Sequence, residues 1–468
     1  PFVGSTQFGG AFLLMRQAVQ LARVAQQTLP AASTKATRLV LSLFFKAVLG
    51  IQRIFHFSTL QDPGLAILTG GRKVLSREQL GSWLRQVPTR AVQALLRDSE
   101  PTVPRHPEHT ISVDEHCVPR FTRKFRIKKG YHTIRNKFMP VEKLFFSFHL
   151  GMRSLLSLIV TRGNGKLCLL AHKLRDRLRP RVRGATVYLL LDAGAAQNTD
   201  SLLRLVEVPD QITIVRTPRR PAYRRQWEKL PASAWQRLEE PGPYSAAPPK
   251  VIHVAQTVTQ LRDTRQRPGR SYPVRTIIVR EAARRGKERW HALWVFGDDT
   301  TPPYKLVERY RQRQHHEQRY RILLHDAFVD TAPSGYNKRS RNPTKPGFLQ
   351  NALPLYAWLC GLATDALERL GRRLGNRFLH AHPRTLRRYW LCIPAELYLL
   401  GADRLLVVLR VKRLRSLWEA LIRRANADPV RIPWLQNRKL LLALDKKIAR
   451  PKSAGLNDPA TREPGVWC

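Results

Sequence analysis

Hydrophobic and polar positions follow a helical period over the first hundred residues of the chain. Apolar side chains recur every three to four positions between residues 12 and 98, most clearly in "LSREQLGSWLRQVPTRAVQALLRD". Ser76 precedes a first turn with Glu78 and Gln79, which is typical of a helix N-cap, and Pro88 divides the segment. The two short basic helices fit either a helix-turn-helix or an ordinary helical hairpin. The proline-rich residues 98–109 then predict a linker.

Beyond this linker the pattern becomes that of strands alternating with helices. "HTISVDEH", "KLFFSFHLG" and "SLLSLIVTRG" predict three strands, the first ending near Asp114. A helix, "KLCLLAHKLRDRL", leads to the apolar strand "ATVYLLLDAG", which ends in Asp192 and has the composition of a strand buried on both faces. A short helix and the strand "QITIVRT" follow. Because strands joined through helices are usually parallel, we expect a mixed α/β sheet with a parallel portion.

The second half of the chain departs from this alternation. Residues 216–290 are rich in proline, arginine and aromatic residues and contain two strand-like runs, so they predict an insertion with a small β portion. "RWHALWVFGDD" resumes the strand pattern, and a basic helix is expected over residues 304–327. From residue 348 onward the pattern predicts helices.

The charge of the chain limits the classes of partner that it is expected to bind. Its 82 lysines and arginines against 34 acids give a net charge of +48, a field that attracts polyanions, nucleic acid above all. An anionic membrane or a ribosomal surface also fits this charge. The longest apolar segments are interrupted by polar residues, which favours core helices over membrane spans. Five scattered cysteines without CxxC spacing argue against a zinc module or a disulfide framework and for a reducing compartment.

Three carboxylates are candidate catalytic residues. Asp114 and Asp192 end strands, where ligand sites of α/β sheets gather, and buried acids are costly unless they are paired or bind a cation. On the basic helix, a helical period places one glutamate on a face with aromatic and basic residues; the stripe consists of Tyr310, Arg313, Glu317, Arg321 and Leu324. Such an oxygen-rich pocket suits Mg²⁺ or Mn²⁺, and two ions promote phosphodiester chemistry. Aspartates at strand ends are, however, also common as purely structural residues. His315 and His316 are expected to be solvated.

Two basic runs with interleaved aromatic residues are candidate contacts for DNA. They are "RFTRKFRIKKGYHTIRNK" at residues 120–137 and "RTPRRPAYRRQWEK" at residues 216–229. Basic side chains there would follow phosphates while the rings stack on bases; a solvated edge strand is the alternative. The residues concerned are Arg123, Lys124, Lys128, Lys129, Arg219, Arg220, Arg224 and Arg225.

The spacing of Tyr310, Arg313 and Glu317 resembles the start of the Tyr-Arg-Glu-Lys signature of one branch of the DDE transposases of bacterial and archaeal insertion sequences. "HTISVDEH" and "TVYLLLDAG" resemble the two aspartate motifs of that family, and "RNPTKPGFLQNALPLYAWL" resembles the segment after its signature. The resemblance covers about residues 111–359. The chain departs from the family at the position of the signature lysine, which is Leu324; Arg321, one turn earlier, is a possible substitute.

The resemblance implies an α/β fold with an RNase H-like mixed sheet and helices, interrupted by a β-containing insertion and flanked by helical N- and C-terminal regions. It makes Asp114, Asp192 and Glu317 the catalytic ligands of two Mg²⁺ (or Mn²⁺) ions. Tyr310 and Arg313 would position the phosphate of a transposon end. The implied organisation is a helical, DNA-binding region at 1–105, catalytic parts at 106–215 and 291–350, the insertion at 216–290, and a helical region at 351–468.

The function that this family implies is DNA transposition. The enzyme would cut transposon ends and join the freed 3′-hydroxyl to target DNA. Its partners would be inverted-repeat ends, target DNA and a second copy of the chain in a synaptic homodimer, in the prokaryotic cytoplasm, without a membrane or a small-molecule substrate. A decayed or repurposed copy that binds DNA without cutting it is the alternative. A basic RNA- or membrane-associated helical protein would explain the charge but not the three carboxylates.

Overall fold

The structure is a computed structural model that divides into two compact units. One unit comprises residues 1–80 and 366–468, and the other residues 81–365. The structure describes residues 1–29, 33–120, 128–132, 135–182, 184–203, 205, 208–218, 220–240, 250–262, 271–282, 288–331 and 352–445.

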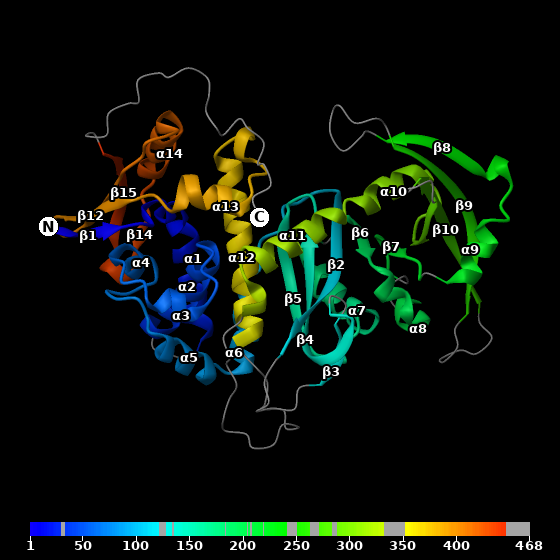
Figure 1. Ribbon diagram of the computed structural model, residues 1–468, viewed down its shortest axis with the longest axis horizontal. Helices are drawn as coiled ribbons and strands as arrows, with labels where there is room; N and C mark the ends of the chain where they lie inside the picture. The colour runs from blue at the N-terminus through cyan, green and yellow to red at the C-terminus, as the bar shows by residue number, and fades with distance from the viewer. Residues whose placement is uncertain are drawn as a thin grey trace. The chain divides into compact units, whose positions relative to one another are not determined.

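The unit of residues 81–365 is built on a mixed sheet (Figure 1). Its first part has the order β5-β4-β2-β6-β7, where the strands are β2 (Glu108–Pro119), β4 (Lys137–His149), β5 (Ser154–Arg162), β6 (Thr186–Leu191) and β7 (Gln211–Arg216). Strand β4 is antiparallel to both β2 and β5, whereas β6 runs parallel to β2 and to β7. The expected succession of three strands, helix, strand, helix and strand is present, and the mixed α/β class is confirmed.

Helices cover this sheet because its central strands are apolar on both faces. Helix α7 (Leu167–Leu178) connects β5 to β6, and α8 (Thr199–Leu203) connects β6 to β7. Leu189 and Leu191 of β6 pack with α7 in one core cluster, while Leu190 packs with α10 (Pro303–Arg311) in another. All three leucines are buried, as expected for a strand with both faces covered.

The insertion continues the same sheet. Strand β11 (Glu288–Phe296) pairs antiparallel with β7, and β10 (Ser271–Ala282), β9 (Lys250–Arg262) and β8 (Trp235–Glu240) follow in turn. A short helix, α9 (Pro221–Trp227), precedes them. The β-rich content predicted for this segment is therefore present, and its strands extend the central sheet (Figure 1).

The basic helix of residues 304–327 is in fact two helices. Helix α10 ends at Arg311 and α11 (Gln314–His325) begins three residues later. Between them the backbone amides of Gln312, Arg313, His315 and His316 donate to carbonyls three residues earlier, which tightens the chain into a 3₁₀-type turn. This turn rotates the residues after Arg313 relative to those before it.

Two helices precede this sheet in the chain, and the first of them begins in the other unit. Helix α5 (Arg77–Gln86) begins with a reciprocal capping box, in which the amide of Gln79 donates to Oγ of Ser76 and the amide of Ser76 donates to Oε1 of Gln79. Helix α6 (Thr89–Asp98) follows Pro88, as the sequence predicts. Farther along the chain, the long helix α12 (Ala352–Arg373) begins after the undescribed residues 332–351.

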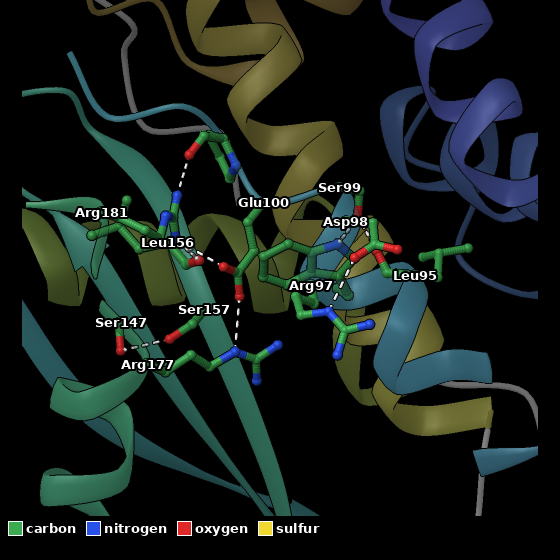
Figure 2. Close-up of polar contacts among 12 residues, drawn as sticks. Leu95, Arg97, Asp98, Ser99, Glu100, Ser147, Leu156, Ser157, Arg177 and Arg181 are labelled. Carbon is green, nitrogen blue, oxygen red and sulfur yellow. Dashed lines mark hydrogen bonds and ion pairs between the residues drawn. The ribbon is translucent and has the colours of Figure 1, made fainter. Parts of the chain in front are cut away.

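A buried ion-pair cluster attaches the end of α6 to the sheet (Figure 2). Oε1 and Oε2 of Glu100 each lie 3.0 Å from a guanidinium nitrogen, the first on Arg177 of α7 and the second on Arg181. Arg181 also donates to the carbonyl oxygen of Leu156 in β5 at 2.9 Å. Nearby, the indole nitrogen of Trp358 in α12 donates to Oγ of Ser99 at 2.7 Å. These bonds link α6, α7, α12 and β5.

The other unit combines helices from both ends of the chain with a second sheet. Its sheet has the order β1-β12-β13-β15-β14, with the strands β1 (Phe2–Thr6), β12 (Ala395–Leu400), β13 (Arg404–Leu409), β14 (Arg431–Ile432) and β15 (Arg438–Leu444). Its helices are α1 (Met15–Thr28), α2 (Ser33–Val48), α3 (Ile54–Ser58), α4 (Pro63–Leu68), α13 (Pro383–Leu386) and α14 (Arg415–Ala427).

The prediction that residues 351–468 are helical was wrong for these strands. Along β13, Leu405, Val407 and Leu409 are buried, while Leu406 and Val408 between them are less so. This period of two is that of a strand, but the positions between are apolar as well, so the alternation is hidden in the sequence. No helix among the described residues is long and apolar enough to cross a membrane.

Candidate active site

Asp114 and Asp192 lie side by side on neighbouring parallel strands. The pairing of β2 with β6 ends at Val113 and Leu191, and the two aspartates are the next residues on their strands. Because residues in register on parallel strands point to the same face, both carboxylates are directed to the same side of the sheet. The sequence predicted that this strand ends near Asp114, which is wrong. Strand β2 runs on to Pro119 because β4 continues to pair with it.

Arg313 joins these two carboxylates to Glu317. Its Nη2 lies 2.5 Å from Oδ2 of Asp114 and 3.8 Å from Oδ2 of Asp192, while its Nη1 lies 3.2 Å from Oε1 of Glu317. The guanidinium is 8% exposed and Asp114 is 14% exposed, whereas Glu317 is 55% exposed. The three acids predicted as a set are therefore gathered around one buried cation, with Glu317 at the solvent side.

Two tyrosines hold the helices against the strands that carry the aspartates. The hydroxyl of Tyr310 in α10 donates to the carbonyl oxygen of Leu191, the residue before Asp192, at 3.1 Å. The hydroxyl of Tyr320 in α11 donates to the carbonyl oxygen of Asp114 at 3.0 Å. Both side chains are buried, so these bonds form away from competing water. Each aspartate is thus positioned through its own backbone.

His316 completes this buried helix face, contrary to the expectation that it is solvated. It is 0% exposed, its Nδ1 lies 2.7 Å from Oγ of Ser112 in β2, and its ring stacks on that of Tyr320 at 5.0 Å. Burial lowers its pKa well below the ordinary value, and Arg313 adds to this effect, so the ring is neutral. His316 therefore packs α11 on the sheet.

Burial and like charge dominate the electrostatics at Asp114. Its pKa is raised to about 6, first by burial and further by Asp192, while Arg313 opposes this shift. Burial alone would lower the pKa of Arg313, but the surrounding acids, Asp114 foremost, raise it above its ordinary value. The site is thus one in which negative charge is costly and a cation is strongly held.

The other stripe residues predicted on this helix lie elsewhere. Arg321 is exposed and Leu324 is half-buried, and the face that meets the sheet is instead formed by Tyr310, Arg313, His316, Tyr320 and Leu323. The 3₁₀-type turn at Arg313 shifts the face relative to an unbroken helix, and the aromatic residues, which gain most from burial, occupy it. Tyr320 and Ser112 were missed because their roles depend on contacts between α11 and β2 that the sequence pattern does not contain.

A second buried acid anchors α11 from its other side. Arg319 donates to the carboxylate of Asp365 in α12 and to the carbonyl oxygen of Arg153. The same carboxylate accepts from Oγ of Ser154 at 2.7 Å and from the amide of Leu155 at 2.9 Å. Asp365 therefore connects α11, α12 and the start of β5.

The carboxylate oxygens of the site are suitable ligands for a hard divalent cation. Carboxylate oxygens are the ligands that Mg²⁺ and Mn²⁺ prefer, and the guanidinium of Arg313 supplies a positive charge held by all three acids. In the part of the chain that the structure describes, no three His, Cys, Asp or Glu side chains lie close enough to hold a metal ion. The residues thus fit a cation in chemistry, with Asp114 and Asp192 as the adjacent pair.

Five of the eight residues in the two basic runs that were predicted to contact DNA lie in the described part of the chain. Lys128 and Lys129 are exposed at the start of β3 (Lys129–His132), which forms a hairpin with β4. Arg220, Arg224 and Arg225 are exposed at α9, where Arg224 pairs with Glu228 at 2.8 Å. Arg123, Lys124 and Arg219 lie outside the described residues. DNA contact by this set stays a prediction.

Comparison with solved structures gives a distant structural likeness. The chain is similar to the piggyBac transposase in a cryo-EM structure of its synaptic complex with hairpin DNA, with a TM-score of 0.41 and 12% sequence identity. The match covers 93% of this chain and 80% of that one. No protein-family model and no curated protein matches the chain. Its function is therefore inferred from the site itself.

Proposed function

We propose that the chain is a DDE-type DNA transposase of the branch with the Tyr-Arg-Glu-Lys signature, in which Asp114, Asp192 and Glu317 carry phosphodiester chemistry. The observation that carries this proposal is the convergence of the three acids on Arg313 at the end of the β2–β6 pairing. Neighbouring acids at a strand end are costly without a cation, and in the chain itself Arg313 supplies that cation. The net charge of +48 supports nucleic acid as the substrate.

The sheet supports an RNase H-like arrangement of the catalytic part. Three antiparallel strands, β5, β4 and β2, are followed on the other side of β2 by β6 and β7, which are parallel to it. In that arrangement the first strand is central, so its aspartate lies next to the one that follows the fourth strand. Asp114 and Asp192 have this relation here.

Each residue of the site has a role that follows from its contacts. Two Mg²⁺ or Mn²⁺ ions, when bound, would activate a water or a 3′-hydroxyl and stabilise the leaving oxygen of the phosphodiester. Asp114 and Asp192 would hold the ions, with Glu317 as the third ligand from the helix. Tyr310 fixes the backbone before Asp192. Arg313, a planar donor of several hydrogen bonds, holds the acids together and suits a phosphate oxygen.

The partners follow from the same proposal. The inverted-repeat ends and the target DNA would contact the exposed basic residues around β3 and α9, together with Arg321 on α11. Bringing two ends together requires two copies of the chain, so the working complex would be a homodimer in the prokaryotic cytoplasm. The cut would release a 3′-hydroxyl that attacks the target strand in line.

The test is metal-dependent nicking of a plasmid that carries the inverted repeats flanking the reading frame. We expect nicking at the repeat boundary with Mg²⁺ or Mn²⁺, and its loss in Asp114→Asn and Glu317→Gln. Glu308→Gln is the matched control, because it removes the same charge from an exposed position on α10. Nicking that persists in Asp114→Asn would contradict the proposal, as would equal losses in Glu308→Gln and Glu317→Gln.

A decayed or repurposed DNA-binding protein is the second candidate, and Leu324 is the observation that favours it. Position 324 lies seven residues from Glu317, roughly 10 Å along a helix. A lysine at this position would therefore contact DNA that lies next to the site, and would not contact the three acids. If the natural chain binds DNA without nicking it and Leu324→Lys restores nicking, decay at this position is established. If both chains bind and neither nicks, a repurposed binding protein is the better description.

A further inference from the structure

A basic cavity lies in the unit of residues 1–80 and 366–468, apart from the carboxylate site. It has a volume of about 760 Å³ and forms where the segment before β12 meets the segment between β13 and α14. Three of the cations that line it are exposed and belong to Arg388, Lys412 and Arg413. Among the described residues, none of these three side chains has an acidic partner.

The acid in this cavity is already neutralised. Asp445 lies 3.9 Å from the guanidinium of Arg410, which also pairs with Glu396. Asp445 and Arg410 both line the cavity, so their charges offset one another there. The surplus positive charge of the cavity is therefore that of Arg388, Lys412 and Arg413.

The N-terminus of α14 adds hydrogen-bond donors to the cavity. Its N-cap residue is Leu414, whose side chain cannot accept a hydrogen bond, and the first turn contains no acid. The first amides of a helix have no partner within the helix, and the helix dipole makes this end positive. Leu414 and the first-turn residue Trp418 both line the cavity, so the helix begins at its wall.

An independent observation comes from the indole of Trp418. The side chain is 0% exposed, and within the described part of the chain its Nε1 has no hydrogen-bond partner. Buried donors without a partner are rare because they lose their bond to water without replacement. Its position in the wall of a cavity with surplus positive charge points to an acceptor that enters from outside, and an anionic oxygen fits both features.

We propose that this cavity binds a backbone phosphate of a DNA strand. Arg388, Lys412 and Arg413 supply charge, the first turn of α14 supplies amide donors, and the N–H of Trp418 supplies a neutral donor. The choice of DNA as the source of the phosphate rests on the proposed function. The unit that carries the second sheet would thus contribute directly to holding DNA, at a contact separate from Asp114, Asp192 and Glu317.

The test is DNA binding by the full chain in EDTA. Binding is measured by the fluorescence anisotropy of a labelled duplex over a range of salt concentrations. The triple variant Arg388→Gln, Lys412→Gln, Arg413→Gln is expected to bind at least about tenfold more weakly, and its log–log salt slope is expected to be shallower by about 0.9 per phosphate lost. The matched control is Arg72→Gln, Lys73→Gln, Arg423→Gln, which removes the same residue types from exposed positions in the same unit.

A second variant separates the neutral donor from the charges. Trp418→Phe keeps an aromatic ring but removes the N–H, so we expect binding to weaken about fivefold with an unchanged salt slope. Equal losses in the two triple variants would show a general charge effect and overturn the proposal, as would wild-type binding by the cavity triple or by Trp418→Phe. Because EDTA prevents cleavage, failure here is distinct from failure of the nicking test.

Discussion

Replacing Arg313 by methionine removes the cation that joins three acids while keeping a side chain of similar reach. The guanidinium is 8% exposed and its closest acid, Asp114, is 14% exposed, so the substitution leaves a buried carboxylate without its partner. Breaking a buried pair in this way costs about 3–5 kcal/mol. We therefore expect the free energy of unfolding of Arg313→Met to fall by about 3 kcal/mol at neutral pH, because Asp192 and Glu317 keep more contact with water.

The assay is urea unfolding, monitored by circular dichroism and arranged as a double-mutant cycle. Wild type, Arg313→Met, Asp114→Asn and the double variant are compared, and the double variant is expected to recover about 2 kcal/mol relative to the sum of the single losses. Arg321→Met, an exposed position on α11, sets the baseline and should change stability by no more than about 0.5 kcal/mol. Additive losses, or an Arg313→Met loss equal to that of Arg321→Met, would refute the assignment of Arg313 as the counter-ion.

Three further predictions concern stability and the support of the site. Burial, with a smaller effect of His109, lowers the pKa of His149 from 6.5 to about 4, so the folded state keeps this ring neutral while the unfolded state protonates it. Stability is then complete above about pH 6.5 and falls by about 3 kcal/mol as the pH decreases to 4; urea midpoints measured against pH should lose this component in His149→Gln. Glu100→Ala leaves Arg177 and Arg181 without their shared acid (Figure 2) and should lower the free energy of unfolding by about 3 kcal/mol, whereas the exposed Glu228→Ala should change it little. Tyr310→Phe deletes the bond to the carbonyl oxygen of Leu191 and should cost about 1–2 kcal/mol in the same assay; an unchanged midpoint would show that this bond does not hold α10 in place.

Much of the central sheet could be predicted from the sequence because its strands have unambiguous patterns. The apolar run that ends at Asp192 is too short for a buried helix and too uniform for a surface strand, so only a covered central strand fits it. The helix that follows each strand then determines the parallel direction. The adjacency of Asp114 and Asp192 follows from that direction once β2 and β6 are neighbours.

The remaining features depend on contacts that a local pattern does not contain. The strand β13 has apolar residues on both faces, so its period of two is hidden and a helix was predicted instead. The turn at Arg313 interrupts a sequence that has good helix formers on both sides, and it arises where the side chain is drawn to the acids of β2 and β6. Tyr320 and Ser112 act through bonds to residues about two hundred positions away in sequence.

The position of Arg313 also explains how the three acids can share one site in the folded chain. Asp114 is buried beside another aspartate, which by itself would favour protonation, and its raised pKa reflects this cost. A permanently charged guanidinium offsets the cost in the folded chain, since arginine keeps its proton in such surroundings. The tyrosine bonds to the carbonyl oxygens of Leu191 and Asp114 then fix the strands without using the carboxylate oxygens. The carboxylate oxygens are therefore held by a side chain, whereas the backbone of the two strands is held by separate bonds that the proposed metal ions would leave in place.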